Sequence, residues 1–380
     1  SASAAPVVEA PPRVETVPEL ARFYGALRGL ADHSRKSHVR VYWMGDSHAQ
    51  ADFWSGALRT ALQDKFGDGG PGFLHLGYKD YRHDGAKFTV HGKWRMRPKK
   101  PSGVKHEADG VFGLGGIAMG GTADAPSAKV ELTKLGAAPL FDFVYRMKEP
   151  HDRIAIEATG VPSTTLTASK DEPEGVLRHA TFRGELPSDA DGHAEFCAAP
   201  AKGSPDFLGL VVETDAATNA GVVLDTLGIN GARYATALAW DEKAWEAEVS
   251  RRPPDLVVLE YGTNEAGEHA EKYDKLGGQV DALLARVRAS APNADCVIVS
   301  ATDRVDAEET VPKVNAELSA AATRLGCFWF DAYTRMGGKG AMARMRDEEE
   351  PRVQKDGIHL TIKGYREYGK VLYDALMAGY

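Results

Sequence analysis

The stretch VRVYWMGDSH, residues 39–48, joins an apolar run to a helical pattern and places a serine at the junction. The run at residues 39–44 is typical of a buried strand, and the regularly spaced apolar residues of a helix follow the serine. A serine hydroxyl is a weak nucleophile until a base removes its proton, and a third group must orient that base. Ser47 is therefore a candidate nucleophile whose base must come from elsewhere in the chain.

A second fragment, the sequence DGIH near the carboxyl end, contains the two residue types that a serine nucleophile needs. Asp356 and His359 are three residues apart and precede another helical pattern. Simpler interpretations exist, because Ser47 could be a helix N-cap and the other two a capping aspartate and a surface histidine. The combination of the three favours a serine hydrolase. Asp46 is expected to hold the turn through its carboxylate, and His48 to be a neighbour of the site.

Alternating strand and helix patterns surround both fragments. Residues 17–70 read helix, strand, helix, and the same alternation returns over residues 225–380. Apolar runs at 256–260, 297–299 and 328–330 are typical of buried strands, and amphipathic helical spacing separates them. Short apolar strands that alternate with such helices predict a parallel sheet with helices on both faces.

The middle of the chain has a different pattern. Residues 75–222 hold short β-type runs separated by Pro, Gly, Asp and Ser turns, without a clear helix between them. This pattern predicts an all-β sandwich or jelly roll. We therefore expect a flexible Pro/Ala-rich linker at residues 1–14 and an α/β domain built from residues 15–74 and 223–380, interrupted by the β insertion.

Three polar segments are expected at one edge of the parallel sheet, because ligands of such sheets bind beyond the carboxyl ends of the strands. Ser47 follows the first strand, and Asn264 and Gly231 follow two later ones, in the segments GTNE and GING. The backbone amides of Ser47 and Gly231 and the side-chain amide of Asn264 could hold the oxyanion of a tetrahedral intermediate. Other glycines that could supply this amide are Gly228, Gly115 and Gly116.

Composition argues against several classes of function. The 380 residues carry 46 Lys and Arg against 54 Asp and Glu, a formal net charge of -8. General nucleic-acid binders usually carry a basic surplus, so no nucleic-acid partner is expected. The sequence has no apolar stretch of about 18 residues, so no membrane span is expected. No targeting sequence is visible in the small, Pro-rich residues at the amino end.

The cysteines and histidines do not predict a metal site. Cys197, Cys296 and Cys327 cannot all pair with one another, and the last two each open a strand-like run, so buried free thiols are expected. No CxxC motif and no zinc-type spacing occurs. Three histidines within residues 75–91 have a spacing that suits neither one helix face nor a known ligand pattern.

Four short blocks occur in the order found in the SGNH (GDSL-type) hydrolases, which the chain resembles. They are GDS ending at Ser47, the glycine Gly231, GTN ending at Asn264, and the Asp356 and His359 pair. The resemblance implies a flavodoxin-like α/β/α sandwich that uses no metal or organic cofactor. It also implies that Ser47 is the nucleophile, His359 the general base and then acid, and Asp356 the group that orients His359. The oxyanion hole would then consist of Ser47, Gly231 and Asn264.

A narrower likeness connects the chain with the SGNH branch that holds bacterial peptidoglycan O-acetylesterases. The tail segments 328–342 and 355–361, and the histidine after Gly-Asp-Ser, are similar to that branch. The branch also carries a β-rich, carbohydrate-module-like insertion. A departure is VSATD at residues 299–303, where relatives more often show a Pro-Pro-Asp type of turn. The likeness implies an exported, periplasmic or cell-envelope serine esterase that removes O-acetyl groups from a bacterial cell-wall glycan through an acyl-enzyme.

Two alternative functions use the same residues differently. An O-acetyltransferase would pass the acyl group from the same triad to a hydroxyl of a polysaccharide instead of to water. A carbohydrate-binding protein would use the β insertion to hold the glycan and leave the triad idle. All three hypotheses share an acetylated or related glycan as the partner.

Overall fold

The computed structural model describes residues 17–105, 109–121, 125–136, 138–168, 175–186, 191–267 and 270–380. The linker predicted at residues 1–14 lies outside the described residues.

A five-stranded parallel sheet lies at the centre of the α/β part, as the sequence predicts. Its strands are β1 (Val39–Gly45), β13 (Val222–Gly228), β14 (Leu256–Glu260), β15 (Asp295–Val299) and β16 (Phe328–Phe330). They lie in the order β13-β1-β14-β15-β16, and every neighbouring pair is parallel. Counted along the chain this is the order 2-1-3-4-5, which is the doubly wound, flavodoxin-like arrangement. The order reverses between β1 and β14, so a crevice is expected at their carboxyl ends.

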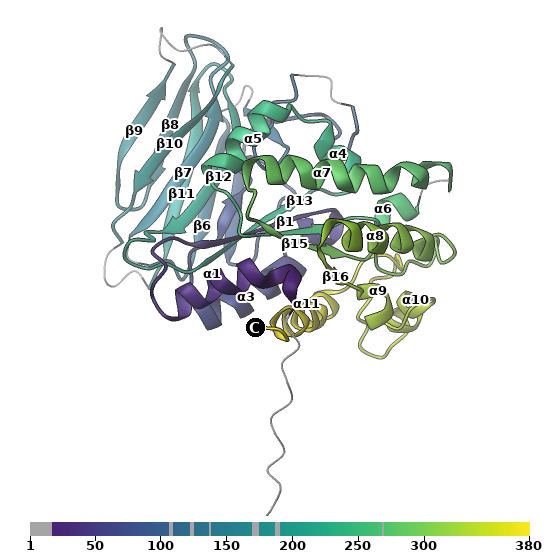
Figure 1. Ribbon diagram of the computed structural model, residues 1–380. Helices are drawn as coiled ribbons and strands as arrows, with labels where there is room; N and C mark the ends of the chain where they lie inside the picture. The colour runs from purple at the N-terminus through teal and green to yellow at the C-terminus, as the bar shows by residue number, and fades with distance from the viewer. Residues whose placement is uncertain are drawn as a thin grey trace, which may run out of the picture.

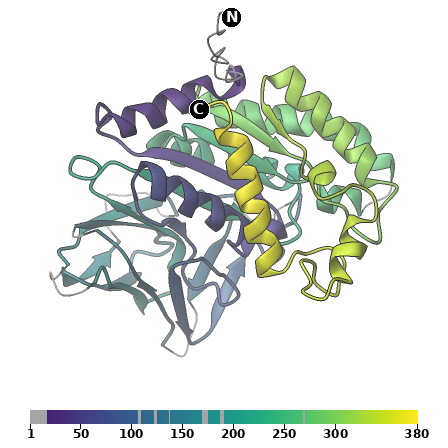
Figure 2. The same ribbon diagram turned by 90° about the horizontal axis from the view of Figure 1, so that it is seen from below.

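Helices cover both faces of this sheet (Figure 1). One layer contains α1 (Ala21–Ala31), α3 (Trp54–Phe66) and α11 (Ile362–Met377), and the other contains α5 (Glu242–Arg251), α7 (Leu276–Ser290) and α8 (Val311–Leu325). Side chains of a strand alternate between its faces, so Val41 and Trp43 pack in the first layer and Tyr42 and Met44 in the second. Figure 2 shows α11 lying beside α3 across the first face.

Short helices occupy the loops between these elements. They are η1 (Pro18–Leu20), α2 (Ser47–Gln50), α4 (Tyr234–Leu238), α6 (Thr263–Ala266), η2 (Ala270–Lys275), α9 (Ala332–Arg335) and α10 (Ala341–Arg346). None of the helices in the described part of the chain combines the length and the apolar character that a membrane crossing requires.

Two antiparallel sheets lie between α3 and β13 in the sequence. The first is ordered β10-β7-β12-β5-β4, with β2 paired to β12, and the second is ordered β3-β6-β11-β8-β9. The strands are β2 (Gly72–Leu74), β3 (Ala86–His91), β4 (Trp94–Arg97), β5 (Ala118–Gly121), β6 (Ser127–Leu132), β7 (Pro139–Arg146), β8 (Arg153–Ala158), β9 (Val161–Thr167), β10 (Leu177–Arg183), β11 (Ala194–Lys202) and β12 (Asp206–Thr214). Phe143 of the first sheet and Val130 and Phe196 of the second share one buried core, so the two sheets pack face to face.

A cluster of charged side chains joins these sheets to helix α5. His179 on β10 lies between Asp142 on β7, 3.0 Å from Nδ1, and Glu248 on α5, 2.8 Å from Nε2. Arg251, also on α5, donates to the same Asp142 carboxylate. Burial would lower the pKa of His179, but the two carboxylates outweigh it and raise the pKa to about 9. The imidazolium is therefore the form that this contact stabilises at neutral pH.

The cysteines correct one expectation from the sequence. Cys296 and Cys327 form a disulfide, with their Cα atoms 4.8 Å apart, and are not free thiols. Cys296 lies in β15 and Cys327 directly precedes β16, and the parallel register pairs Val297 with Phe328. Two cysteines that precede residues paired across neighbouring strands are held side by side, which brings their sulfurs within bonding reach. Cys197 is a free, half-buried thiol.

Candidate active site

Ser47 begins the short helix α2 at the carboxyl end of β1. The turn that carries it is tight, because a Cβ atom on Gly45 would lie 2.5 Å from the Oε2 atom of Glu260 on β14. Asp46 caps the helix, and its Oδ1 atom accepts a hydrogen bond of 2.9 Å from the backbone N–H of His48. The expectation that Asp46 holds the turn is confirmed. Ser47 itself is half-buried, so its hydroxyl is accessible from one side.

His359 and Asp356 come from the turn before α11, and they meet Ser47 across the sheet edge. The Nε2 atom of His359 lies 2.8 Å from Ser47 Oγ, and Nδ1 lies 2.7 Å from Asp356 Oδ2. The other carboxylate oxygen, Oδ1, accepts the backbone N–H groups of Ile358 and His359 at 2.9 and 3.0 Å. The sequence-predicted serine, histidine and aspartate therefore form one hydrogen-bonded series.

The environment of Asp356 favours its charged form. Partial burial would raise its pKa, but the hydrogen bonds from the His359 ring and from the two backbone amides lower it below the ordinary value. The carboxylate thus stays ionised and accepts a proton of the His359 ring. This arrangement fixes the tautomer in which Nε2 faces Ser47 without a proton, as a general base must.

His48 packs against the ring of His359 on the buried side of the site. Its ring centroid is 5.3 Å from that of His359. It is fully buried, with Nδ1 2.9 Å from Tyr365 Oη of α11 and Nε2 3.4 Å from Thr302 Oγ1. Burial, followed by the charge of His359, lowers the pKa of His48 to about 3. His48 is therefore neutral at physiological pH, and it supports the ring of His359 as an uncharged neighbour.

Asn264 lies in the short helix α6 after β14, and Gly231 lies on the turn after β13. The Nδ2 atom of Asn264 donates to the Ala232 carbonyl at 3.0 Å and to Asp46 Oδ2 at 3.2 Å. On the other side of Gly231, the backbone N–H of Asn230 donates to the Gln50 side chain of α2. Gly231 adopts a positive φ of 77°. The residues on either side of Gly231 thus connect its turn to the helix of Ser47 and to Asn264.

The other glycines proposed from the sequence have different surroundings. A Cβ atom on Gly228 would lie 2.3 Å from the backbone nitrogen of Gln50, so this glycine lets β13 approach α2. Gly115 packs against Phe73 and His75, and Gly116 packs against Trp240. A side chain at any of these three positions would collide with its neighbours, which is a sufficient reason for glycine and requires no contact with Ser47.

Three buried acids, Asp46, Glu260 and Glu265, lie close together beside Ser47, and the burial of Glu260 was not expected from the sequence. Burial raises the pKa of Asp46 to about 7, and burial and the charge of Asp46 raise the pKa of Glu260 well above its usual value. Glu260 Oε2 is buried without a hydrogen-bond partner among the described residues. Glu265 accepts the backbone amides of Tyr234 and Gly262. The signal available in the sequence was an acid that directly ends an apolar run, LVVLE at residues 256–260.

The described residues contain no group of three or more His, Cys, Asp or Glu side chains placed to hold a metal ion. His75 and His83 are buried, and burial lowers their pKa values to about 3 and about 4. Both are therefore neutral. His91 is exposed on β3.

The sequence of residues 194–367 matches the model of the GDSL-like Lipase/Acylhydrolase family. The matched segment contains Gly231, Asn264, Asp356 and His359. Ser47 precedes this segment in the sequence, and the fold brings its hydroxyl into contact with His359. The resemblance to the GDSL-type hydrolases that the sequence predicts is confirmed. No match is found among curated protein sequences.

Solved structures extend the comparison to the whole chain. A peptidoglycan O-acetylesterase shares the fold with a TM-score of 0.75, over 96% of this chain and 96% of that chain, at 21% identity. A GDSL-like lipase from Bacteroides thetaiotaomicron aligns over 42% of this chain and 77% of that chain, with 19% identity and a TM-score of 0.32. A family two carbohydrate esterase from Clostridium thermocellum aligns over 68% and 95%, with 12% identity and a TM-score of 0.31.

Proposed function

We propose that the chain is a serine esterase that removes O-acetyl groups from a bacterial cell-wall glycan. The observation that carries the proposal is the contact of 2.8 Å between Ser47 Oγ and His359 Nε2, made by residues 312 positions apart. A chance contact would not also place an ionised carboxylate 2.7 Å from the opposite ring nitrogen. This is the geometry that turns a hydroxyl into a nucleophile.

The reaction proceeds in two halves. Ser47 Oγ forms a bond to the acetyl carbonyl carbon as its proton moves to His359 Nε2, and Asp356 stabilises the imidazolium that results. The tetrahedral intermediate breaks its bond to the sugar oxygen, which takes the proton from Nε2. Water then attacks the acetyl-enzyme with the same base, and acetate leaves as Ser47 regains its proton.

The oxyanion hole of this mechanism uses the amides of Ser47 and Gly231 and the side chain of Asn264. Asn264 has two amide hydrogens, which now bond Ala232 and Asp46. The longer bond, to Asp46 at 3.2 Å, is the one that the oxyanion replaces. The bond to the Ala232 carbonyl stays in place and keeps the Asn264 side chain oriented, so that only one of its two hydrogens has to change partner.

The substrate class rests on the fold shared with a peptidoglycan O-acetylesterase along almost the whole chain. The two packed β sheets lie, apart from β2, within the inserted domain that we propose at residues 75–222, and they are in keeping with a carbohydrate-module-like part that holds the glycan. An exported or cell-envelope enzyme would meet such a substrate. The Cys296–Cys327 disulfide supports this location, because disulfides persist in oxidising compartments.

The test is the release of acetate from purified O-acetylated peptidoglycan, compared in the wild type and in Ser47→Ala. We expect Ser47→Ala to lose hydrolysis of both the glycan and small acetyl esters while its circular dichroism and thermal unfolding stay unchanged. Activity that survives this substitution would exclude Ser47 as the nucleophile. Transfer of the acetyl group to an added glycan, in excess over free acetate, would instead identify an acetyltransferase.

A further inference from the structure

A cavity of about 460 Å³ lies beside the turn that carries Gly231. It is bounded by the loop at residues 100–104, by α4, and by the start of α7. The Thr236 hydroxyl of α4 donates to the Ser102 carbonyl, which fixes the loop against the α/β part. Ser102 Oγ lies 3.3 Å from the position of a Cβ atom on Gly231. The cavity therefore touches the turn that we assign to the oxyanion hole.

Positive charge dominates the lining of this cavity. Among the described residues, Lys100, Arg233 and Lys275 line it, and Glu265 is the one carboxylate in this described lining. Both oxygens of Glu265 accept backbone amides, so this acid is already engaged in holding the fold. Lys100 and Lys275 are exposed, and neither makes an ion pair with a described residue. Their charges are therefore available to a ligand.

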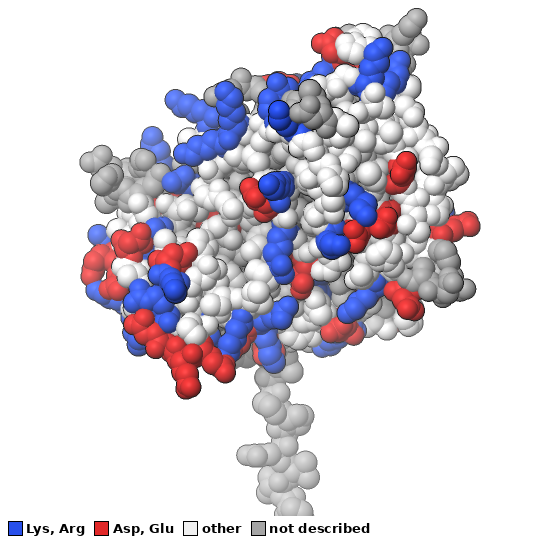
Figure 3. Space-filling view, turned by 180° about the vertical axis from the view of Figure 1, so that it is seen from behind, with Lys and Arg blue, Asp and Glu red and all other residues white. Residues whose placement is uncertain are grey.

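The basic character extends along the strand and loop that lead to the cavity. Residues 93–105 contain six Lys and Arg and no Asp or Glu. Arg97 of β4 is engaged with Asp206. The distribution contrasts with the formal net charge of -8. Figure 3 shows the same unevenness, with Lys and Arg gathered at the upper left of one face and most of the acids elsewhere.

We propose that this cavity binds a carboxylate carried by the acetylated glycan, so that the enzyme prefers acidic to neutral acetylated polysaccharides. The inference rests on the proposed esterase function and adds a substrate class to it. The two exposed lysines supply the positive charge that a carboxylate meets at the rim of the cavity. Arg233, whose Nη1 donates to the Gly231 carbonyl at 3.5 Å, adds positive charge on the side of that turn. A carboxylate held there would fix the sugar next to the Gly231 turn, with its ester directed to Ser47.

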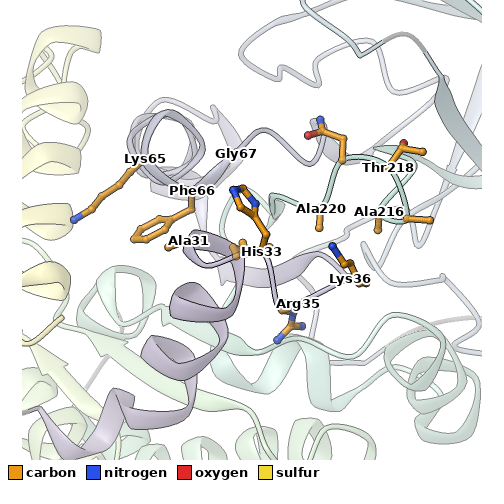
Figure 4. A pocket seen from close by; sticks show the side chains of 13 residues that line it. Ala31, His33, Arg35, Lys36, Lys65, Phe66, Gly67, Ala216, Thr218 and Ala220 are labelled. Carbon is orange, nitrogen blue, oxygen red and sulfur yellow. The ribbon is translucent and has the colours of Figure 1, made fainter.

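The double variant Lys100→Gln/Lys275→Gln tests the inference, because glutamine keeps a polar side chain and removes only the charge. The matched control is Lys36→Gln, an exposed lysine beside the cavity of about 390 Å³ at the opposite end of the sheet (Figure 4). The measurement is kcat and KM for acetate release from soluble O-acetylated peptidoglycan fragments, from acetylated xylan fragments, and from a small acetyl ester.

We expect the double variant to raise KM for the peptidoglycan fragments about tenfold at low salt, since each exposed pair of opposite charges contributes up to about 1 kcal/mol, or about fivefold. Values for xylan and for the small ester should stay unchanged, as should all values of Lys36→Gln. The difference should shrink at about 0.5 M salt, which screens exposed charges. An unchanged KM for peptidoglycan, or an equal rise for xylan, would overturn the inference.

Two further arms separate the possible outcomes. Fragments stripped of their peptides distinguish a carboxylate on the sugar, for which the effect persists, from a carboxylate on the peptide, for which it disappears. The affinity of acidic fragments for Ser47→Ala, measured with and without the two lysine substitutions, tests binding at the cavity independently of turnover. Loss of that binding in the lysine variant supports the carboxylate site even if Ser47 proves not to be the nucleophile, whereas equal binding refutes it.

Discussion

Replacing Asp356 by asparagine removes the negative charge of the proposed triad while keeping the size of the side chain. Oδ1 of Asp356 accepts two backbone amides, and Oδ2 accepts the ring proton of His359 at 2.7 Å. Asparagine has one oxygen for these two tasks. If that oxygen keeps the backbone amides, its NH2 group faces His359 Nδ1, which must then lose its proton. The ring consequently adopts the tautomer that points an N–H at Ser47, and the base is lost.

The magnitude follows from what the asparagine cannot supply. A hydrogen bond to a charged group contributes about 1.5–3 kcal/mol, and the imidazolium formed in the transition state also loses its counter-charge. The Asp356 side chain is 42% exposed, so solvent limits this second contribution. Together they amount to about 3–5 kcal/mol, which corresponds to a fall in kcat of about 10²- to 10⁴-fold.

The assay is the initial rate with a chromogenic acetyl ester, measured with thermal unfolding to verify the fold. Asp374→Asn is the matched control, because Asp374 is an exposed acid near the end of α11 that pairs only with Lys370 among the described residues. Its rate should equal that of the wild type. A decrease of less than about tenfold for Asp356→Asn would refute the reasoning that this carboxylate orients His359.

Two other perturbations test separate parts of the structure. Asn264→Ala removes one proposed oxyanion donor, and we expect kcat for the small ester to fall about 10²- to 10³-fold with KM little changed; a change confined to KM would contradict this. The raised pKa of His179 predicts stability that is fully present below pH 6.5 and is lost as the pH rises through about 9, by an amount of the order of 3 kcal/mol. Denaturant unfolding between pH 6 and 10 should show this loss in the wild type and a flatter profile in His179→Gln, and equal profiles would refute it.

Local patterns in the sequence predict the parts of the structure that depend on neighbouring residues. The apolar run before Ser47 and the run before Asn264 are both strands. Both residues lie at the same edge of the sheet, because the carboxyl ends of parallel strands all lie at one edge. The pairing of Ser47 with His359 could be expected from the residue types that a serine nucleophile needs and from the resemblance to a family. No periodicity connects residues 312 positions apart.

Features that depend on register or close approach could not be predicted in this way. The disulfide of Cys296 and Cys327 requires β15 and β16 to be neighbours with a particular alignment, which neither run encodes alone. The burial of Glu260 depends on Gly45, whose missing side chain allows β1 and β14 to meet. Most residues of β10 are half-buried, so its alternation of polar and apolar side chains is too weak to mark a strand in the sequence.

The wide separation of Ser47 and His359 along the chain also affects biosynthesis. At about 5–20 residues per second, a ribosome needs roughly a quarter of a minute to a minute to pass from one to the other. During that time the nascent polypeptide carries a hydroxyl with no partner, and a prematurely terminated product lacks α11 as well as the imidazole. The proposed triad can therefore form only after the turn that carries Asp356 and His359 has been synthesised, because a chain that stops before this turn has Ser47 without its base.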